Sequence, residues 1–142
     1  MSQRKVSHTV VNYYTHKNFR SKLRQLKQYD TSARVMGLDI GRKFTGIALS
    51  DRELTKADSF KTLREYDTMS DKVSFYQAMQ NIIRSKHVRG IVVGYPLNED
   101  GQGTRHCKFI EEFLDALAAR KVFRSVPVTL VNEYNSTMMA KL

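Results

Sequence analysis

The sequence predicts an α/β fold: a five-stranded mixed sheet flanked by helices, with a basic N-terminal extension. Strand-like runs and helix-like periodicities follow one another from residue 34 onward in the order β-β-β-α-β-α-β. A length of 142 residues suits one hydrophobic core. Large aliphatic side chains are dense after residue 34 and sparse before it. We therefore expect one domain over 34–142 and an extension over 1–33.

The domain opens with two strand-like runs, "RVMGLDI" (34–40) and "FTGIALS" (44–50). Both are rich in β-formers, and the "GRK" between them contains a glycine that permits a tight connection. The pair predicts an antiparallel hairpin. After the polar stretch "DRELTK", the run "DSFKTL" (58–63) predicts a third strand.

Two helices and two strands complete the predicted domain. Helix 69–86 presents an apolar face made of Val73, Tyr76, Met79, Ile82 and Ile83. The continuous apolar run "VRGIVVGYP" (88–96) is typical of a strand buried on both faces. Helix 104–121 presents Phe109, Ile110, Phe113, Leu114 and Leu117, and "VPVTLVNE" (126–133) predicts the fifth strand. Helical crossovers should place the last strands parallel to the first.

The extension carries most of the net positive charge. The chain has a formal charge of +10, and residues 1–30 hold seven cations and one acid, a local excess of +6. Within it, "HKNFRSKLRQLKQY" (16–29) spaces Phe19, Leu23 and Leu26 as a short amphipathic helix. Three interpretations stay open: an organelle-targeting presequence, an RNA-binding arm or a solvated tail.

This charge favours a polyanionic partner, with nucleic acid as the first candidate. The candidate nucleic-acid-binding residues are the cations of the extension and of the first hairpin: Arg4, Lys5, Lys17, Arg20, Lys22, Arg24, Lys27, Arg42 and Lys43. No apolar run approaches the roughly 20 residues of a membrane helix, so we expect a soluble protein with no membrane partner.

Cysteine and histidine usage excludes several kinds of site. Cys107 is the only cysteine, so the chain can form neither an internal disulfide nor a cysteine-based zinc cluster. We expect a structural thiol and an intracellular, reducing compartment. The four histidines lack metal-ligand spacing and are interpreted as ordinary polar residues.

Asp39 is the residue that most needs an explanation, because it is a lone acid within an apolar run. Burying an unpaired charge costs several kcal/mol, roughly. If the first and fifth strands are central and parallel, Asp39 and Glu133 converge at one edge of the sheet and could share a divalent cation, Mg²⁺ or Mn²⁺. In the alternative, Asp39 pairs with Arg42 or Lys43, and Glu133 caps the following turn.

Three segments resemble, in order and spacing, the signature blocks of the YqgF/RuvX family of Holliday junction resolvase-like proteins in the RNase H superfamily. They are "GLDIGRKFTGIALSD" (37–51), "IVVGYPLNEDG" (91–101) and "VTLVNEYNST" (128–137). The resemblance implies an RNase H-like fold and metal-dependent cleavage of structured nucleic acid such as precursor ribosomal RNA. It also implies that Asp39 and Glu133 are the catalytic, metal-binding acids. The residues it assigns to a loop at the rim of the site are Gly94, Pro96, Asn98, Asp100 and Gly101.

Departures from the family pattern leave the activity open. Asn132 stands where the family has an aspartate, and Tyr134 and Asn135 replace an arginine and a leucine. The family also continues to a further aspartate, whereas this sequence ends at Leu142. Two carboxylates are a poor scaffold for the two cations of two-metal hydrolysis.

Three hypotheses follow, and the first is our main one. The chain is a catalytically degenerate, structured-RNA-binding member of the family, a component or assembly factor of a ribonucleoprotein such as a mitochondrial ribosome, and needs no cofactor to bind. In the second, it is an active Mg²⁺-dependent endonuclease that processes precursor ribosomal RNA or resolves Holliday junctions. In the third, the apolar stripe of the extension docks a protein partner. The compartment would be the mitochondrion or the cytoplasm.

Overall fold

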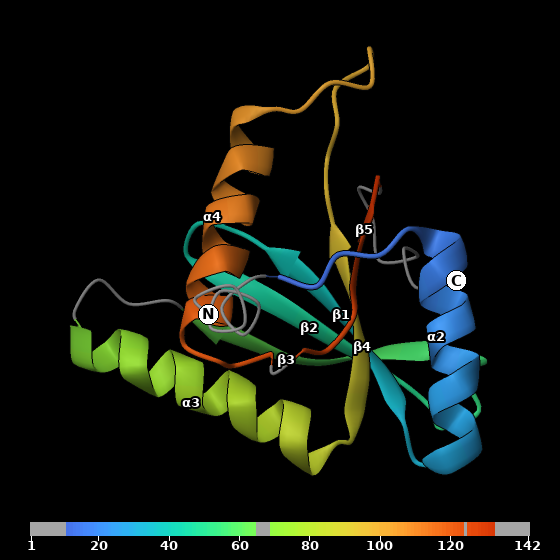
Figure 1. The fold of residues 1–142 in the computed structure, drawn as a ribbon. Helices are drawn as coiled ribbons and strands as arrows, with labels where there is room; N and C mark the ends of the chain where they lie inside the picture. Colours follow the sequence, from blue (N-terminus) through green and yellow to red (C-terminus); the bar gives the residue numbers. More distant parts are fainter. Residues whose placement is uncertain (1–10, 65–68, 124, 133–142) are drawn as a thin grey trace, which may run out of the picture.

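A computed structural model describes residues 11–64, 69–123 and 125–132 (Figure 1). Its strands are β1 (Arg34–Ile40), β2 (Phe44–Ser50), β3 (Ala57–Arg64), β4 (Val88–Gly94) and β5 (Val128–Val131). Its helices are α2 (His16–Tyr29), α3 (Met69–Ser85) and α4 (Arg105–Ala119). This confirms the predicted α/β architecture, and each strand boundary lies within two residues of its prediction.

The five strands form one mixed sheet in the order β3-β2-β1-β4-β5. β1 and β2 pair antiparallel, as do β2 and β3, whereas β4 pairs parallel with both β1 and β5. The predicted hairpin and crossovers are therefore confirmed. Because β1, β4 and β5 run in the same direction, their last residues meet at one end of the sheet, which we call the carboxyl edge.

Helices α3 and α4 cover one face of the sheet, and their buried side chains pack there against those of the strands. On α3 the buried side chains are Phe75, Met79, Ile82 and Ile83, whereas Val73 is 36% exposed. The predicted face is therefore rotated, because Phe75 rather than Val73 completes the i, i+4, i+7, i+8 pattern. On α4, Ile110, Phe113, Leu114 and Leu117 are buried as predicted, and Phe109 is half-buried.

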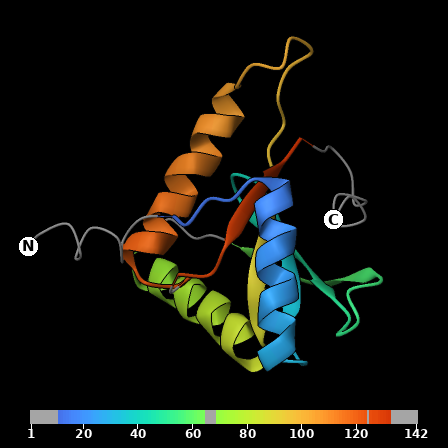
Figure 2. The same cartoon turned by 45° about the vertical axis from the view of Figure 1, so that its right-hand side comes forward.

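Helix α2 covers part of the other face of the sheet (Figure 2). The predicted amphipathic helix has the expected bounds, and Thr15 caps its first turn. Its stripe residues Phe19 and Leu23 pack against Val35, Val92 and Val131 from β1, β4 and β5. Burial of each of these two side chains contributes about 1.5–3 kcal/mol. The apolar stripe is therefore covered by this chain's own sheet, and a protein partner cannot dock on Phe19 and Leu23.

Backbone contacts also hold the segment before α2 to the sheet. The Tyr14 N–H donates to the Val128 carbonyl at 2.7 Å, and the Val128 N–H donates to the Asn12 carbonyl at 2.9 Å. Tyr13 and Val128 thus form a parallel β-bridge. Residues 1–10 lie outside the described part of the chain. No helix in the described ranges is long and apolar enough to cross a bilayer.

Candidate nucleic-acid site at the carboxyl edge

The carboxyl edge brings together three of the predicted segments. β1 contributes Asp39, β4 ends at Gly94, and β5 ends one residue before Asn132. Glu133 follows but lies outside the described residues. β1 and β5 are parallel, as the predicted approach of Asp39 and Glu133 requires, but β5 is the last strand of the sheet rather than a central one. The separation of the two carboxylates stays a prediction.

Asp39 is exposed, so the expectation that it is buried is wrong. Its neighbours Leu38 and Ile40 point into the core under α3 and α4, and strand alternation turns Asp39 to the other face. There its cross-strand neighbour is Gly46, and a Cβ placed on Gly46 would lie 3.7 Å from the Asp39 Cβ. Glycine has no side chain with which to cover the carboxylate.

The alternative ion pair of Asp39 is not formed within the described ranges. No ion pair there joins it to Arg42 or Lys43. Arg42 instead places its guanidinium carbon 4.8 Å from the centre of the Phe109 ring. Asp39 therefore has no described partner that neutralises it.

His106 and Phe109 of α4 fix the turn that follows Asp39. The His106 Nε2–H donates to the Ile40 carbonyl at 2.8 Å. The imidazole stacks on the Phe109 ring at 5.7 Å, and Arg42 lies over the same ring. Histidine spacing predicts only an ordinary polar residue at His106, since nothing in the separation of residues 40 and 106 indicates their contact.

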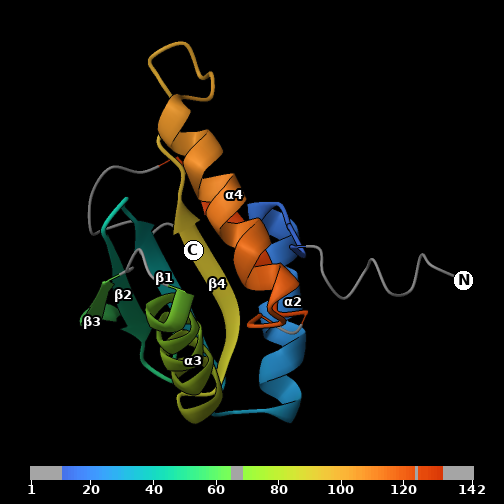
Figure 3. The ribbon, with the colours of Figure 1, turned by 90° about the vertical axis from the view of Figure 1, so that its left-hand side faces the viewer.

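The rim loop, residues 95–104, rises from the end of β4 and returns into α4 (Figure 3). It contains four of the five residues assigned to the rim, and Gly94 ends β4 directly before it. The side-chain oxygen of Asn98 accepts hydrogen bonds from the backbone N–H groups of Asp100 and Gln102, at 3.0 and 2.8 Å. Gly101 has φ +76°, a conformation that favours glycine. The tip is therefore organised by its own residues.

Hydrogen bonds join the base of the rim loop to α4 and to β5. The Thr104 hydroxyl accepts the Cys107 N–H at 3.2 Å and caps α4, and the buried Cys107 thiol donates to the Pro96 carbonyl. The Asn132 side-chain oxygen accepts the Leu97 N–H at 3.2 Å. Cys107 is thus a structural thiol, as predicted, and Asn132 positions the rim loop.

The Tyr95 hydroxyl joins the loop to α4, because it donates to the Glu111 carboxylate. This hydrogen bond raises the pKa of Tyr95, and burial and the negative charge of Glu111 add to the rise.

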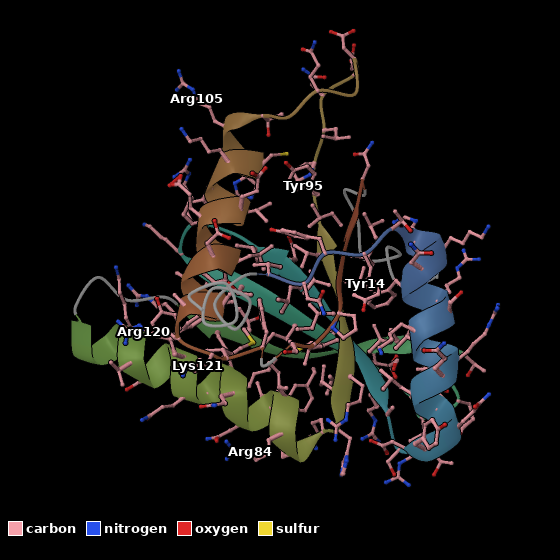
Figure 4. All side chains as sticks on the ribbon, viewed as in Figure 1. Tyr14, Arg84, Tyr95, Arg105, Arg120 and Lys121 are labelled. Atoms are coloured by element: carbon pink, nitrogen blue, oxygen red, sulfur yellow. The ribbon has the colours of Figure 1, made fainter. Side chains whose placement is uncertain are left out.

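The predicted basic residues are dispersed. Lys17, Arg20 and Arg24 are exposed on α2, Lys22 is half-exposed, and Arg4 and Lys5 lie outside the described residues. Figure 4 shows Arg105 beside the rim loop at the start of α4, and Arg84, Arg120 and Lys121 at the other end of the molecule. Cations therefore surround the fold rather than forming one patch.

Lys27 has a different role from the predicted one. Its ammonium group donates to the carbonyls of Thr31, Ala33 and Arg52. These bonds join the end of α2 to the β2–β3 turn. Because its three donors are used within the protein, we do not assign Lys27 to a nucleic-acid surface.

This chain is similar to several known proteins. The family model described as RuvX, Holliday junction resolvase, matches residues 33–142. A Lachnospira eligens protein named "Putative pre-16S rRNA nuclease" is 37% identical over 107 residues, covering 75% of this chain and 74% of that protein. One of the same name from Thermoanaerobacter pseudethanolicus is 31% identical over 112 residues, covering 76% and 73%. A solved structure, T. thermophilus RuvC in complex with Holliday junction substrate, is 12% identical, covers 69% of this chain and 63% of that one, and gives a TM-score of 0.47.

The sheet order and the helices on both faces define an α/β protein with an RNase H-like fold. Within that class, the chain belongs to the RuvX family of Holliday junction resolvases. The family resemblance and the fold class predicted from the sequence are both confirmed.

Proposed function

We propose that this chain is a metal-dependent endonuclease that acts on structured precursor ribosomal RNA. One observation carries the proposal: Asp39, within the range matched by the RuvX family model, presents an exposed carboxylate at the carboxyl edge. The names of the relatives, with pre-16S rRNA as the substrate, support this reading over our main sequence-based hypothesis of a non-catalytic protein.

The metal would be Mg²⁺, held by Asp39 and Glu133. The described residues contain no group of three or more histidine, cysteine or acidic side chains that could hold a metal, so Asp39 needs ligands from outside the described ranges. The Asp39 carboxylate is exposed and the neighbouring Gly46 has no side chain, so a hydrated cation has room to bind there. When bound, Mg²⁺ supplies Lewis-acid stabilisation of a phosphoryl oxygen.

The protein's own residues would hold the RNA beside Asp39. The exposed cation Lys43 follows Asp39 in the hairpin turn and can contact a phosphate, whereas Arg42 lies over the Phe109 ring. The rim loop bounds the same edge and is held by Asn132 and Thr104. Exposed cations on α2 extend the positive charge along the face on which Asp39 lies.

The test measures cleavage of a precursor ribosomal RNA transcript by the purified chain with Mg²⁺. We expect Asp39→Asn and Glu133→Gln each to slow cleavage by at least about 100-fold. Asp58→Asn, at an exposed acid of β3, is the matched control and should cleave normally. Because Asp39 has no described partner, Asp39→Asn should keep the melting temperature of the parent chain. The proposal would be contradicted if Asp39→Asn cleaved the transcript as fast as the parent chain, or if the parent chain cleaved it fully in EDTA.

A second candidate is RNA binding without cleavage, as a component of a ribonucleoprotein such as a mitochondrial ribosome. Asn132 favours it, because a neutral amide stands where the family motif has an aspartate. The same assay separates the two candidates. Salt-sensitive binding of the transcript, with no Mg²⁺-dependent cleavage of it or of a four-way DNA junction, would replace the nuclease by the binding protein.

A further inference from the structure

The end of the β1–β2 hairpin carries an exposed aromatic side chain next to two cations. Phe44 is 53% exposed and directly follows the exposed Arg42 and Lys43. The turn is tight: the Gly41 N–H donates to the Phe44 carbonyl at 2.9 Å, and a Cβ on Gly41 would lie 2.8 Å from that oxygen. Only glycine fits at position 41, so the chain holds Phe44 and its two cations in a fixed turn.

Phe44 lies on the same face of the sheet as Asp39. Phe44 and Gly46 are two residues apart on β2, so their side-chain positions share a face. Gly46 is the cross-strand partner of Asp39, which makes Phe44 a diagonal neighbour of Asp39 at about 7–8 Å between Cα atoms. This separation is of the order of one nucleotide.

Beyond Arg64, which pairs with Phe44 across β2 and β3, the surface next to Phe44 is made of small residues that are not part of the apolar cluster under α2. Across β2 and β3, Gly46 pairs with Thr62 and Ala48 pairs with Ser59. The apolar cluster under α2 takes residues from β1, β4 and β5 and none from β2 or β3. We call this surface the ledge; it consists of Phe44, Gly46, Ala48, Ser59 and Thr62. Apart from Phe44, its side chains are small.

We propose that the ledge binds single-stranded RNA, with a base stacked on Phe44 and a neighbouring phosphate on Lys43. A flexible single strand exposes the faces of its bases, and aromatic rings bind them largely without sequence preference. The exposed cation Lys43, directly before Phe44, and the chain's net charge of +10 complement a phosphate backbone. The choice of RNA rests on the proposed function, and the inference adds how the strand would reach Asp39.

Fluorescence anisotropy with a labelled oligouridine tests the ledge. Phe44→Ala should weaken binding about tenfold, and Phe44→Trp should restore it, because stacking of one base supplies an effect of this size. Phe60→Ala is the matched control: Phe60 is 43% exposed on β3, but its ring contacts Lys86 instead of the ledge. Lys43→Gln should lower the slope of log affinity against log salt by about 0.7, and Lys61→Gln should leave it unchanged.

The outcomes separate this inference from the proposed nuclease activity. If Phe44→Ala binds like the parent chain, or Phe44→Ala and Phe60→Ala lose affinity equally, the ledge is not the binding surface, even if Asp39→Asn abolishes cleavage. If Phe44→Ala weakens binding while no cleavage occurs with Mg²⁺, the ledge stands and the nuclease proposal fails. If Phe44→Ala lost as much affinity for an RNA duplex as for the single strand, the assignment of the ledge to single-stranded RNA would be overturned.

Discussion

Asp39 and Gly46 face each other across the β1–β2 pair, and a Cβ on Gly46 would lie 3.7 Å from the Cβ of Asp39. That is an ordinary van der Waals distance. At Gly90 of β4, by contrast, a Cβ would lie 2.8 Å from the end of the Phe19 ring and 3.0 Å from a methyl group of Leu23. Gly46 therefore leaves the Asp39 carboxylate uncovered, whereas Gly90 allows α2 to pack closely on the sheet.

These two glycines should therefore respond differently to alanine. We expect Gly90→Ala to lower the free energy of unfolding by about 1–3 kcal/mol, since α2 must move away from β4. Gly46→Ala should stay within about 1 kcal/mol of the parent chain. Urea denaturation followed by circular dichroism measures both values. Equal stability of the two variants would contradict the close packing of Phe19 on Gly90.

The second prediction concerns Lys27, whose ammonium donates to three carbonyls. Lys27→Met keeps most of the aliphatic stem but leaves these carbonyls without their donor, so the unfolding free energy should fall by about 1–3 kcal/mol. Lys17→Met, at an exposed position of α2, should leave stability unchanged and weaken RNA binding instead. Thermal denaturation and anisotropy measure the two effects. A large loss of RNA affinity without a loss of stability in Lys27→Met would overturn its structural role.

The third prediction concerns Asn132, which accepts a hydrogen bond from the Leu97 N–H. A carboxylate oxygen can accept the same bond, so Asn132→Asp should keep the fold while adding a negative charge next to Glu133. We expect stronger Mg²⁺ binding and faster RNA cleavage than in the parent chain. Isothermal titration calorimetry with Mg²⁺ and the transcript assay measure these effects. Asn132→Ala is the control for the hydrogen bond and should gain neither property.

The fourth prediction concerns Tyr13, which lies beside α4. Burial raises its pKa from the ordinary value of 10.0 to about 12, and the carboxylates of Asp115 and Glu111 add to the rise. Between these two values the folded chain keeps a phenol proton that the unfolded chain has lost. The unfolding free energy must therefore fall as the pH rises through this window.

Tyr13→Phe removes that proton difference. Between pH 9 and 11.5 its urea midpoint should fall less steeply than that of the parent chain. Tyr29→Phe is the control, because Tyr29 is 89% exposed. Identical slopes for Tyr13→Phe and the parent chain would refute the assignment.

Much of the fold could be predicted because apolar periodicity is a local property of the chain. The strands of the hairpin, the buried strand β4 and the bounds of α2 all follow from patterns within about 15 residues. The error on α3 has a local cause, since Val73 and Phe75 both fit a helical stripe. Only packing in the tertiary structure, where the Phe75 ring contacts Phe113 of α4, selects Phe75.

The candidate site was less predictable than the fold. Its motif blocks identify Asp39, but the exposure of Asp39 depends on which residue β2 places opposite it. The contact between His106 and Ile40 spans 66 residues, and the Asn132 bond to Leu97 spans 35. No local pattern encodes these pairs. Phe44 could have been singled out from "GRKF", where an aromatic residue follows two cations at a turn.

By itself, the sequence determined the order and type of the elements, the family and the excess of positive charge. Tertiary structure decided that the apolar stripe of α2 packs against the chain's own sheet and that Lys27 donates its hydrogen bonds to backbone carbonyls. It also decided that the Asp39 side chain is exposed to solvent beside the ledge. The physical reason is that secondary structure follows from neighbours along the chain, whereas exposure and hydrogen-bond partners depend on which distant strands and helices become adjacent.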